Sequence, residues 1–332
     1  MVLPKVSGVE FDAQIESTGL RSKITNALWG ISFLLRNGIP KKAYRFGGGL
    51  GDHLMTSAVF HEFRRRGFSN LWMMSDNPDL FLNNTDIDKV VPDNWMTHKY
   101  CSRVGATPTV LSYGKWINDN DRIDPPRRHI IAEILEKAGI HGEVKLRPYY
   151  FTKQTKANKP KNNRIICIQG ANTSSSTPML NKQWHPSRFV EIANILNQHY
   201  ELHQIGLKGE SDIPVTKDFR GQLSIAQTAE VLSNARFFIG QVGFLMHLAR
   251  AVNTRSIIIY GGREKAKQSG YPCNENLEAH PECSPCWRNN ECEFNRECLD
   301  DIKVSDVLSA VERIETRLTN PLETERAFIS ST

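Results

Sequence analysis

The stretch Phe46-Gly-Gly-Gly-Leu-Gly-Asp-His-Leu-Met55 decides the fold of this chain. Its glycines allow backbone conformations and close approaches that other residues do not, and a segment with helical spacing follows directly. The stretch therefore predicts a tight turn from a strand into a helix, with the Asp52 carboxylate at the start of that helix. A dinucleotide fingerprint would need glycine at position 52, and the chain contains no Gly-Lys-Ser/Thr of a P-loop. Asp52 is thus either a functional carboxylate or a simple helix-terminal charge.

The length and charge of the chain limit the number of domains and the kinds of binding partner that the protein can have. A chain of 332 residues favours two domains, each with its own core. The 42 basic and 36 acidic residues give a net charge of +6, which suits an anionic small molecule or a membrane surface and is too small for a nucleic-acid-binding protein.

The N-terminal region carries no secretion signal, so we expect a cytoplasmic protein. The apolar run at residues 24–35 is shorter than the ~20 residues that a membrane span needs. Residues 24–42 therefore either form an extra helix packed on the first domain or make a peripheral contact with the inner membrane.

Strand and helix signals alternate twice along the chain, which predicts two α/β units with parallel sheets and ligands at the carboxyl edges of their strands. Residues 43–46 and 71–74 read as the first strands, and residues 165–168 start the second series. Residues 94–128 show no clear periodicity and predict loops over a cleft. The expected division is an N-terminal extension at 1–42, domains at 43–152 and 165–300, a polar linker at 153–164, and a final helix at 301–320, with Ser305 as its cap and a loose end after it.

A hydroxyl-rich segment follows the first strand of the second series. Gly170-Ala-Asn-Thr-Ser-Ser-Ser-Thr177 precedes Lys182-Gln-Trp-His-Pro186, which opens a helix. Hydroxyls, an ammonium group and free backbone amides suit a pyrophosphate, so Ser176, Thr177 and Lys182 are candidate binding residues. The alternative for the serines is a plain surface loop.

These motifs together resemble glycosyltransferase family 9, the ADP-heptose:lipopolysaccharide heptosyltransferases and their relatives. The resemblance covers about residues 43–312 and rests on Gly49-Leu-Gly-Asp-His-Leu-Met-Thr-Ser-Ala58, on Lys182-x-Trp-x-Pro186 and on residues 219–227 and 240–251. It implies an α/β protein of the GT-B fold, in which two Rossmann-like domains face each other across a cleft. It also implies an inverting enzyme of bacterial lipopolysaccharide or other surface-glycan synthesis, which moves a heptose or related sugar from a nucleotide-diphosphate donor, such as ADP-heptose, to a glycan, lipid-linked or protein hydroxyl.

The resemblance also implies roles for single residues of the first domain. Asp52 would be the general base, and Gly49 and Gly51 of the same turn would bind the substrate or donor. No catalytic metal is expected, because Lys182 and backbone amides would neutralise the departing diphosphate.

In the second domain, the resemblance implies that Lys182 binds the donor phosphates and Glu210 the ribose hydroxyls. Gly243 and His247 would bring a helix N-terminus to the diphosphate. The acid that the family carries before this helix is missing, because Gln241 stands in that region. This departure leaves the donor sugar open and keeps a non-catalytic nucleotide-sugar-binding protein as an alternative.

A cysteine-rich segment lies near the C-terminus. It contains Cys-x2-Cys-x5-Cys-x5-Cys and is too polar to build a core, so a metal ion or disulfides must hold it. Because cytosolic thiols stay reduced, we expect these cysteines to bind a structural zinc or iron ion. Such a site agrees with the resemblance to family 9. The cysteines also keep open a second alternative function, that of a metal- or iron–sulfur-dependent redox protein. The expected ligands are Cys283, Cys286, Cys292 and Cys298 of a knot at 273–298, with Cys273 as a further candidate.

Overall fold

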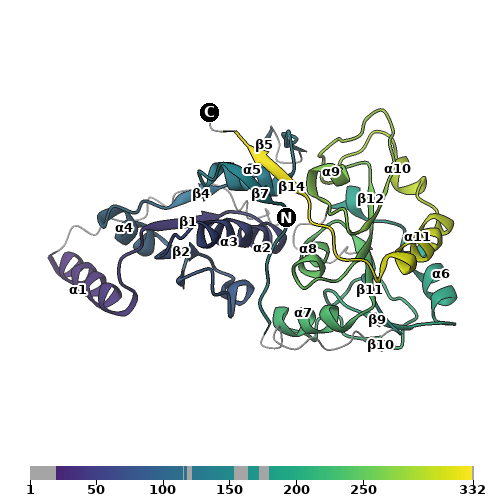
Figure 1. The fold of residues 1–332 in the computed structure, drawn as a ribbon, viewed down its shortest axis with the longest axis horizontal. Coiled ribbons are helices and arrows are strands. Elements are labelled where there is room, and N and C mark those ends of the chain that lie inside the picture. The colour runs from purple at the N-terminus through teal and green to yellow at the C-terminus, as the bar shows by residue number, and fades with distance from the viewer. Residues whose placement is uncertain (1–19, 115, 118–121, 153–163, 172–178, 331–332) are drawn as a thin grey trace, which may run out of the picture.

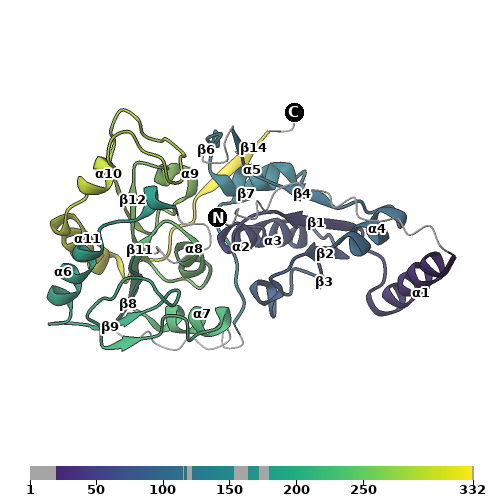
Figure 2. The same cartoon turned by 180° about the vertical axis from the view of Figure 1, so that it is seen from behind.

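The computed structural model describes residues 20–114, 116–117, 122–152, 164–171 and 179–330. Within these ranges the chain forms two bodies, each built on a parallel sheet, that lie next to each other along the long axis of the molecule (Figure 1). The view from behind shows the same two bodies, with helices on both faces of the sheets (Figure 2). The α/β class and the two facing Rossmann-like units predicted from the sequence are confirmed.

The first sheet has four parallel strands in the order β3-β2-β1-β4. Its central strand β1 pairs Tyr44 with Met73 on one side and with Thr109 on the other. The strands are β1 (Lys42–Phe46), β2 (Leu71–Met74), β3 (Lys89–Val91) and β4 (Thr109–Leu111).

The prediction of loops for residues 94–128 is wrong in part. This region contains strand β4 and helix α4 (Trp95–Arg103), along with the short strands β5 (Trp116–Ile117) and β6 (Arg122–Ile123). Strand β4 has only three residues, too few to show alternation. Helix α4 does carry a start signal, because the side chain of Asn94 accepts a hydrogen bond from the amide of Thr97.

The helix predicted after the glycine turn is divided in two. Helices α2 (Leu50–Met55) and α3 (Ser57–Arg65) meet at Thr56, whose hydroxyl donates to the carbonyl of His53 at 2.7 Å. Such back-bonding by threonine competes with the regular helical ladder. The first domain is completed by η1 (Pro78–Phe81), α5 (Ile130–Lys137) and β7 (Gly142–Lys145).

Helix α1 (Leu20–Asn37) packs on the first domain. This confirms the expectation that residues 24–42 include an extra helix of that domain. The ring of Phe33 lies 6.1 Å from that of Trp72 and 4.9 Å from that of Tyr100. Its outer face keeps Leu28, Ile31 and Leu35 exposed. No helix in the described ranges has the length and apolar character to cross a bilayer.

The second sheet has six parallel strands in the order β10-β9-β8-β11-β12-β13. The side chains of Ile166, Phe237 and Ile257 are fully buried and form the centre of its core. The strands are β8 (Ile165–Ile168), β9 (Glu201–Gln204), β10 (Lys217–Asp218), β11 (Phe237–Gln241), β12 (Ser256–Gly261) and β13 (Glu275–Glu278).

The helices of the second domain start where the sequence predicts. Pro186 opens α6 at its first position, and Ser224 caps α7 by accepting a hydrogen bond from the amide of Gln227. The remaining elements are η2 (Leu180–Lys182), α6 (Pro186–Leu196), α7 (Ile225–Asn234), α8 (Phe244–Ala251), α9 (Ala266–Ser269), α10 (Glu297–Asp300) and α11 (Val304–Arg317).

The C-terminal part differs from the expectation. Helix α11 packs on the second domain beside α6. The Asp306 carboxylate closes its first turn by accepting from the amide of Lys303, so the predicted cap at Ser305 is wrong. The segment expected to be loose forms strand β14 (Arg326–Ile329), which pairs antiparallel with β7. This strand, yellow in Figure 1, is the element that returns to the first domain.

Candidate active site

The two domains touch at the carboxyl edges of their sheets, where α2 meets α8. A Cβ atom added to Gly51 would lie 3.2 Å from Cδ2 of His247 and 3.4 Å from Cα of Phe244. Such distances are tighter than ordinary van der Waals contact, so glycine is needed for the two helices to approach this closely. The glycine turn therefore serves the contact between the domains as well as the chain reversal.

Asp52 lies at this contact with both carboxylate oxygens held. Oδ2 accepts from the amide of Gly49 at 2.9 Å, and Oδ1 accepts from the hydroxyl of Tyr113 at 2.9 Å. Burial raises the pKa of Asp52, and the hydrogen bonds from Tyr113 and Gly49 and the charge of Lys182 oppose this rise without cancelling it. The side chain remains partly accessible. It is therefore a fixed carboxylate with a higher basicity than one in water.

Sequence reasoning missed Tyr113. It follows β4, the strand hidden in the region predicted as loops, and it reaches Asp52 because β4 lies beside β1 in the sheet. Burial raises the pKa of Tyr113 well above its usual value, so the phenol keeps its proton and remains a donor. On the other side of Asp52, Nδ1 of His53 lies 3.1 Å from Oγ of Ser75, and burial lowers the pKa of His53. His53 is thus a neutral neighbour of the carboxylate.

Lys182 ends η2 and faces a second carboxylate that the sequence did not reveal. Its Nζ lies 2.7 Å from Oε1 of Glu264, and the two side chains are 15% and 4% exposed. Nη1 of Arg263 lies 2.9 Å from the same oxygen. Burial alone would raise the pKa of Glu264, but Lys182 and Arg263 outweigh it and lower the value to about 2. The only sequence signal was the glycine pair Gly261-Gly262 after a buried strand.

Gln241 occupies the region where the family acid is missing, and its side chain makes hydrogen bonds within the second domain. Its Oε1 accepts from the amide of Trp184, and its Nε2 donates to the carbonyl of Gly170 and to Oε1 of Gln183, both at 3.2 Å. With its exposure at 3%, Gln241 ties β11 to the segment around Lys182. Its hydrogen bonds therefore help to hold the backbone next to Lys182 in place.

His247 in the first turn of α8 is buried and neutral. Its Nδ1 lies 2.7 Å from the hydroxyl of Tyr271, and burial lowers its pKa to about 3. A Cβ atom added at Gly243, which precedes α8, would meet no atom within 4 Å. The helix start therefore has room in front of it, while the His247 ring packs at the domain contact; their roles in donor binding stay predictions.

Glu210 lies beyond the carboxyl end of β9. Its Oε1 accepts from Nε2 of Gln169 at 3.1 Å, and within the described part of the chain its Oε2 is buried without a hydrogen-bond partner. Burial raises the pKa of Glu210 to about 7. A buried carboxylate with an unused oxygen suits a pair of hydroxyls. Ser176 and Thr177, the other predicted donor-binding residues, lie outside the described residues.

None of the seven cysteines forms a disulfide in this structure. One cavity of about 550 Å³ is lined by all four cysteines of the predicted knot, together with Gly262, Arg263 and Arg296 among others. Cys273 does not line it, and its side chain is buried in the main core. In the ranges that the structure covers, no three His, Cys, Asp or Glu side chains are arranged to hold a metal ion, so the metal knot stays a prediction.

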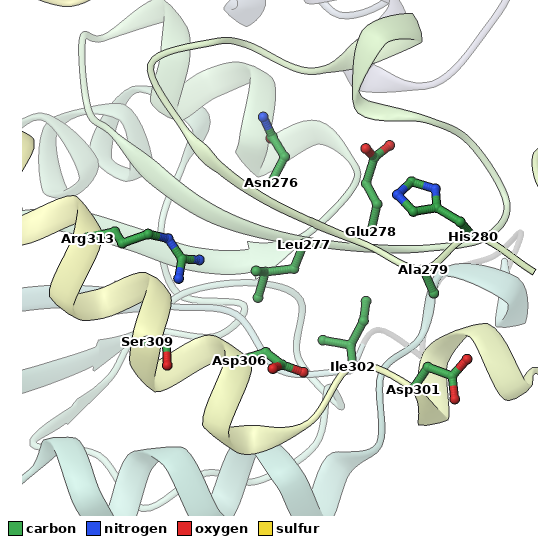
Figure 3. Close-up of a pocket in the computed structure, with 10 residues that line it drawn as sticks. All are labelled: Asn276, Leu277, Glu278, Ala279, His280, Asp301, Ile302, Asp306, Ser309 and Arg313. Atoms are coloured by element: carbon green, nitrogen blue, oxygen red, sulfur yellow. The ribbon is translucent and has the colours of Figure 1, made fainter.

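A second cavity, of about 580 Å³, lies elsewhere, between β13 and α11. Its polar side chains include Glu278 of β13, Arg313 of α11, and His280, which follows β13 (Figure 3). Neither Asp52 nor Lys182 lines it.

Comparisons with known proteins agree with this geometry. Residues 135–296 match the sequence model of glycosyltransferase family 9 (heptosyltransferase). No curated protein sequence matches the chain.

Solved structures show the same fold at low sequence identity. The dodecameric iron-containing heptosyltransferase TibC from enterotoxigenic E. coli H10407 gives a TM-score of 0.64 at 19% identity, over 85% of this chain and 78% of that chain, and a complex of TibC with ADP-D-β-D-heptose gives 0.64 at 17%. A family 9 glycosyltransferase from Veillonella parvula gives 0.59 at 13% identity, over 84% and 98% of the two chains. E. coli ADP-heptose lipopolysaccharide heptosyltransferase II gives 0.57 at 11%, over 83% and 99%. Residues 135–296 thus match the family 9 model, and the chain shares the GT-B fold of these glycosyltransferase structures.

Proposed function

We propose that the protein is an inverting transferase that moves a heptose or a related sugar from a nucleotide-diphosphate donor to a hydroxyl group of a bacterial surface glycan or a protein. The second domain holds the donor, and the first domain holds the acceptor. The observation that carries the proposal is Asp52, a carboxylate of the first domain fixed by Gly49 and Tyr113 at the contact with the second domain, where Lys182 is near enough to lower its pKa.

In the proposed reaction, the acceptor oxygen forms a bond to the anomeric carbon while the bond from that carbon to the diphosphate oxygen breaks. Asp52 takes the acceptor proton, and the leaving group departs as the nucleoside diphosphate. Attack from the face opposite the leaving group inverts the anomeric centre. Lys182 and the backbone amides at the start of α8 neutralise the charge that develops on the diphosphate.

The environment of Asp52 suits a base that must be ionised at neutral pH and still accept a proton. Burial makes the carboxylate more basic than one in water, and Tyr113, Gly49 and Lys182 limit that rise. The raised pKa of Tyr113 keeps its hydroxyl protonated, so it is a donor to Asp52 and no competitor for the acceptor proton.

The proposal includes a structural zinc or iron ion on Cys283, Cys286, Cys292 and Cys298. The kind of ligand is suitable, because four cysteine side chains line one cavity and tetrathiolate sites take either metal. Such an ion would supply a closed cross-link for a polar segment. Metal analysis of the purified protein tests it: about one zinc or iron per chain is expected, and a metal-free, fully folded protein would contradict it.

A peripheral membrane contact through α1 also belongs to the proposal. Leu28 and Leu35 are 63% and 81% exposed on a helix whose last turn carries Arg36. Flotation with vesicles that contain anionic phospholipid tests this contact, and failure to float would remove it without affecting the transfer reaction.

The sugar-transfer proposal is tested in two steps. A thermal-shift panel of nucleoside diphosphates and nucleotide sugars, with ADP-heptose included, is expected to show stabilisation by one nucleotide family, because a ligand of the folded state raises the melting temperature. Release of the diphosphate from the stabilising donor is then followed, and NMR of the freed or transferred sugar gives its anomeric configuration. No stabilisation by any donor would contradict the proposal, and retention of configuration would contradict the role of Asp52.

A further inference from the structure

The ion pair of Lys182 is itself held by a segment far away in the sequence. Lys182 and Arg263 bind the same oxygen of Glu264, so these three charged groups, with side chains 15%, 2% and 4% exposed, form one cluster near Asp52. Two cations and one carboxylate leave the cluster with one positive charge, which suits a diphosphate. What fixes the two cations therefore sets where that charge is presented.

The side chain of Arg263 is fixed by residues that lie between Cys286 and Cys292 in the sequence. Its Nη2 donates to Oδ1 of Asn289 at 2.8 Å, and its guanidinium group lies 4.9 Å from the centre of the Trp287 ring. The amide of Trp287 donates to the carbonyl of Arg263 at 2.9 Å. With exposures of 2% for Arg263 and 7% for Asn289, this arm of the cluster is closed to water.

The backbone that carries Lys182 is fixed by the same segment. The amide of Asn181 donates to the carbonyl of Asn289 at 2.9 Å, and its side-chain Nδ2 donates to the carbonyl of Glu291 at 2.8 Å and to that of Arg288 at 3.2 Å. Asn289 therefore bonds both arms, one through its side chain and the other through its carbonyl.

The segment also contacts the first domain near the base. The amide of Ile123 donates to the carbonyl of Trp287 at 3.2 Å, and the rings of Trp287 and Tyr113 lie 6.5 Å apart. Trp287 thus links the donor-side cluster to the tyrosine that holds Asp52.

The geometry points to a positioning function for residues 287–291: they clamp Lys182 and Arg263 around Glu264, and Glu264 and Asn289 are positioning residues for the diphosphate of the donor. The inference rests on the proposed function, because it assigns the cluster to the donor of that reaction. The cysteine-rich segment then has a task in substrate binding, which it performs through residues 287–291 between its cysteines. Glu264 directs the ammonium group of Lys182 and keeps it charged in a site whose burial lowers the pKa of this lysine.

Two variants test the clamp with ADP as the probe. Glu264→Gln removes the carboxylate charge but keeps the shape of the side chain, and Asn289→Ala removes only the bond to Arg263. The matched control is Glu293→Gln, the same change at an exposed residue of the same segment. Isothermal titration gives the Kd of ADP from pH 6 to pH 10, and thermal melting shows whether each variant is folded.

For the wild type, ADP binding is expected to be lost at alkaline pH, where Lys182 loses its proton. In Glu264→Gln the pH at which binding is half lost moves down by at least one unit, because the paired carboxylate no longer favours the charged lysine. Asn289→Ala weakens ADP binding at least fivefold at pH 7, and Glu293→Gln behaves as the wild type. A structural role alone would change the Kd equally at every pH.

The outcomes separate the inference from the proposed function. Binding of ADP by the wild type with an unmoved alkaline limit in Glu264→Gln, or an unchanged Kd in Asn289→Ala, would overturn the clamp and leave the donor site intact. No binding of ADP to the wild type would overturn both the ADP donor and the clamp. If Glu264→Gln fails to fold, Asn289→Ala decides the question, because it leaves all three charges of the cluster in place.

Discussion

Replacement of Tyr113 by phenylalanine isolates one hydrogen bond at the proposed base. In the wild type the hydroxyl of Tyr113 donates to Oδ1 of Asp52 at 2.9 Å and lowers the pKa of the carboxylate. The variant keeps the ring and removes only the donor. Among the residues that the structure describes, the amide of Gly49 is then the remaining hydrogen-bond donor to Asp52.

The size of the effect follows from this single bond. A hydrogen bond to an ionised group contributes about 1.5–3 kcal/mol. One pKa unit corresponds to about 1.4 kcal/mol, so the pKa of Asp52 is expected to rise by roughly one to two units in the variant. A general base works only when it is deprotonated, so the acidic limb of the pH–rate profile moves to higher pH by the same amount, while the rate at high pH changes little.

The assay follows release of ADP from ADP-heptose between pH 4 and pH 9. The matched control is Tyr200→Phe, because the hydroxyl of Tyr200 also donates to a carboxylate at 2.9 Å, that of Glu315 in the second domain. This control is expected to leave the acidic limb unmoved. An unmoved limb in Tyr113→Phe, or an equal shift in the control, would refute the role assigned to this hydrogen bond.

Two further predictions concern the domain contact and the nucleotide. Gly51→Ala places a methyl group 3.2 Å from His247 and 3.4 Å from the backbone of Phe244, so the two domains must move apart. The variant is expected to lose turnover about tenfold, while its Kd for ADP stays within about twofold of the wild-type value. A wild-type rate would contradict the close contact. Glu210 has a pKa of about 7 in the folded protein against an ordinary 4.5, so its ionisation destabilises the fold progressively as the pH rises from 4.5 to 7. Denaturant unfolding at pH 8 is therefore expected to show that Glu210→Gln is more stable than the wild type by about 2–3 kcal/mol. Ionisation of Glu210 is expected to strengthen ADP binding by the wild type between pH 6 and pH 8, and the same variant should lose this gain. An unchanged gain in the variant would remove Glu210 from the ribose site.

Much of the fold follows from local signals in the sequence. The strands at residues 71–74 and 165–168, the helix start at Pro186 and the cap at Ser224 are found where predicted, because each depends on side chains within a few residues of one another. Strand β4 has no such signal, since its three residues are a strand only because β1 offers an edge to pair with.

The candidate site could be predicted only in part for the same reason. Asp52 and Lys182 sit in motifs, whereas Tyr113 and Glu264 reach them through the order of strands in the sheets, which no short window of sequence contains. The missing acid near Gln241 was visible in the sequence, but its consequence was not, because the internal bonds of the Gln241 amide depend on the packing of β11 against the Lys182 segment.

The most direct test of the central claim is the transfer rate of Asp52→Asn beside its ability to bind the donor. The change keeps the size of the side chain and removes the basic group, so release of ADP from ADP-heptose should fall at least a hundredfold while the Kd of ADP stays within about twofold of the wild type. Asp79→Asn, at an exposed residue of the same domain, is the control and should keep the full rate. Turnover at the wild-type level in Asp52→Asn would contradict the assignment of Asp52 as the base.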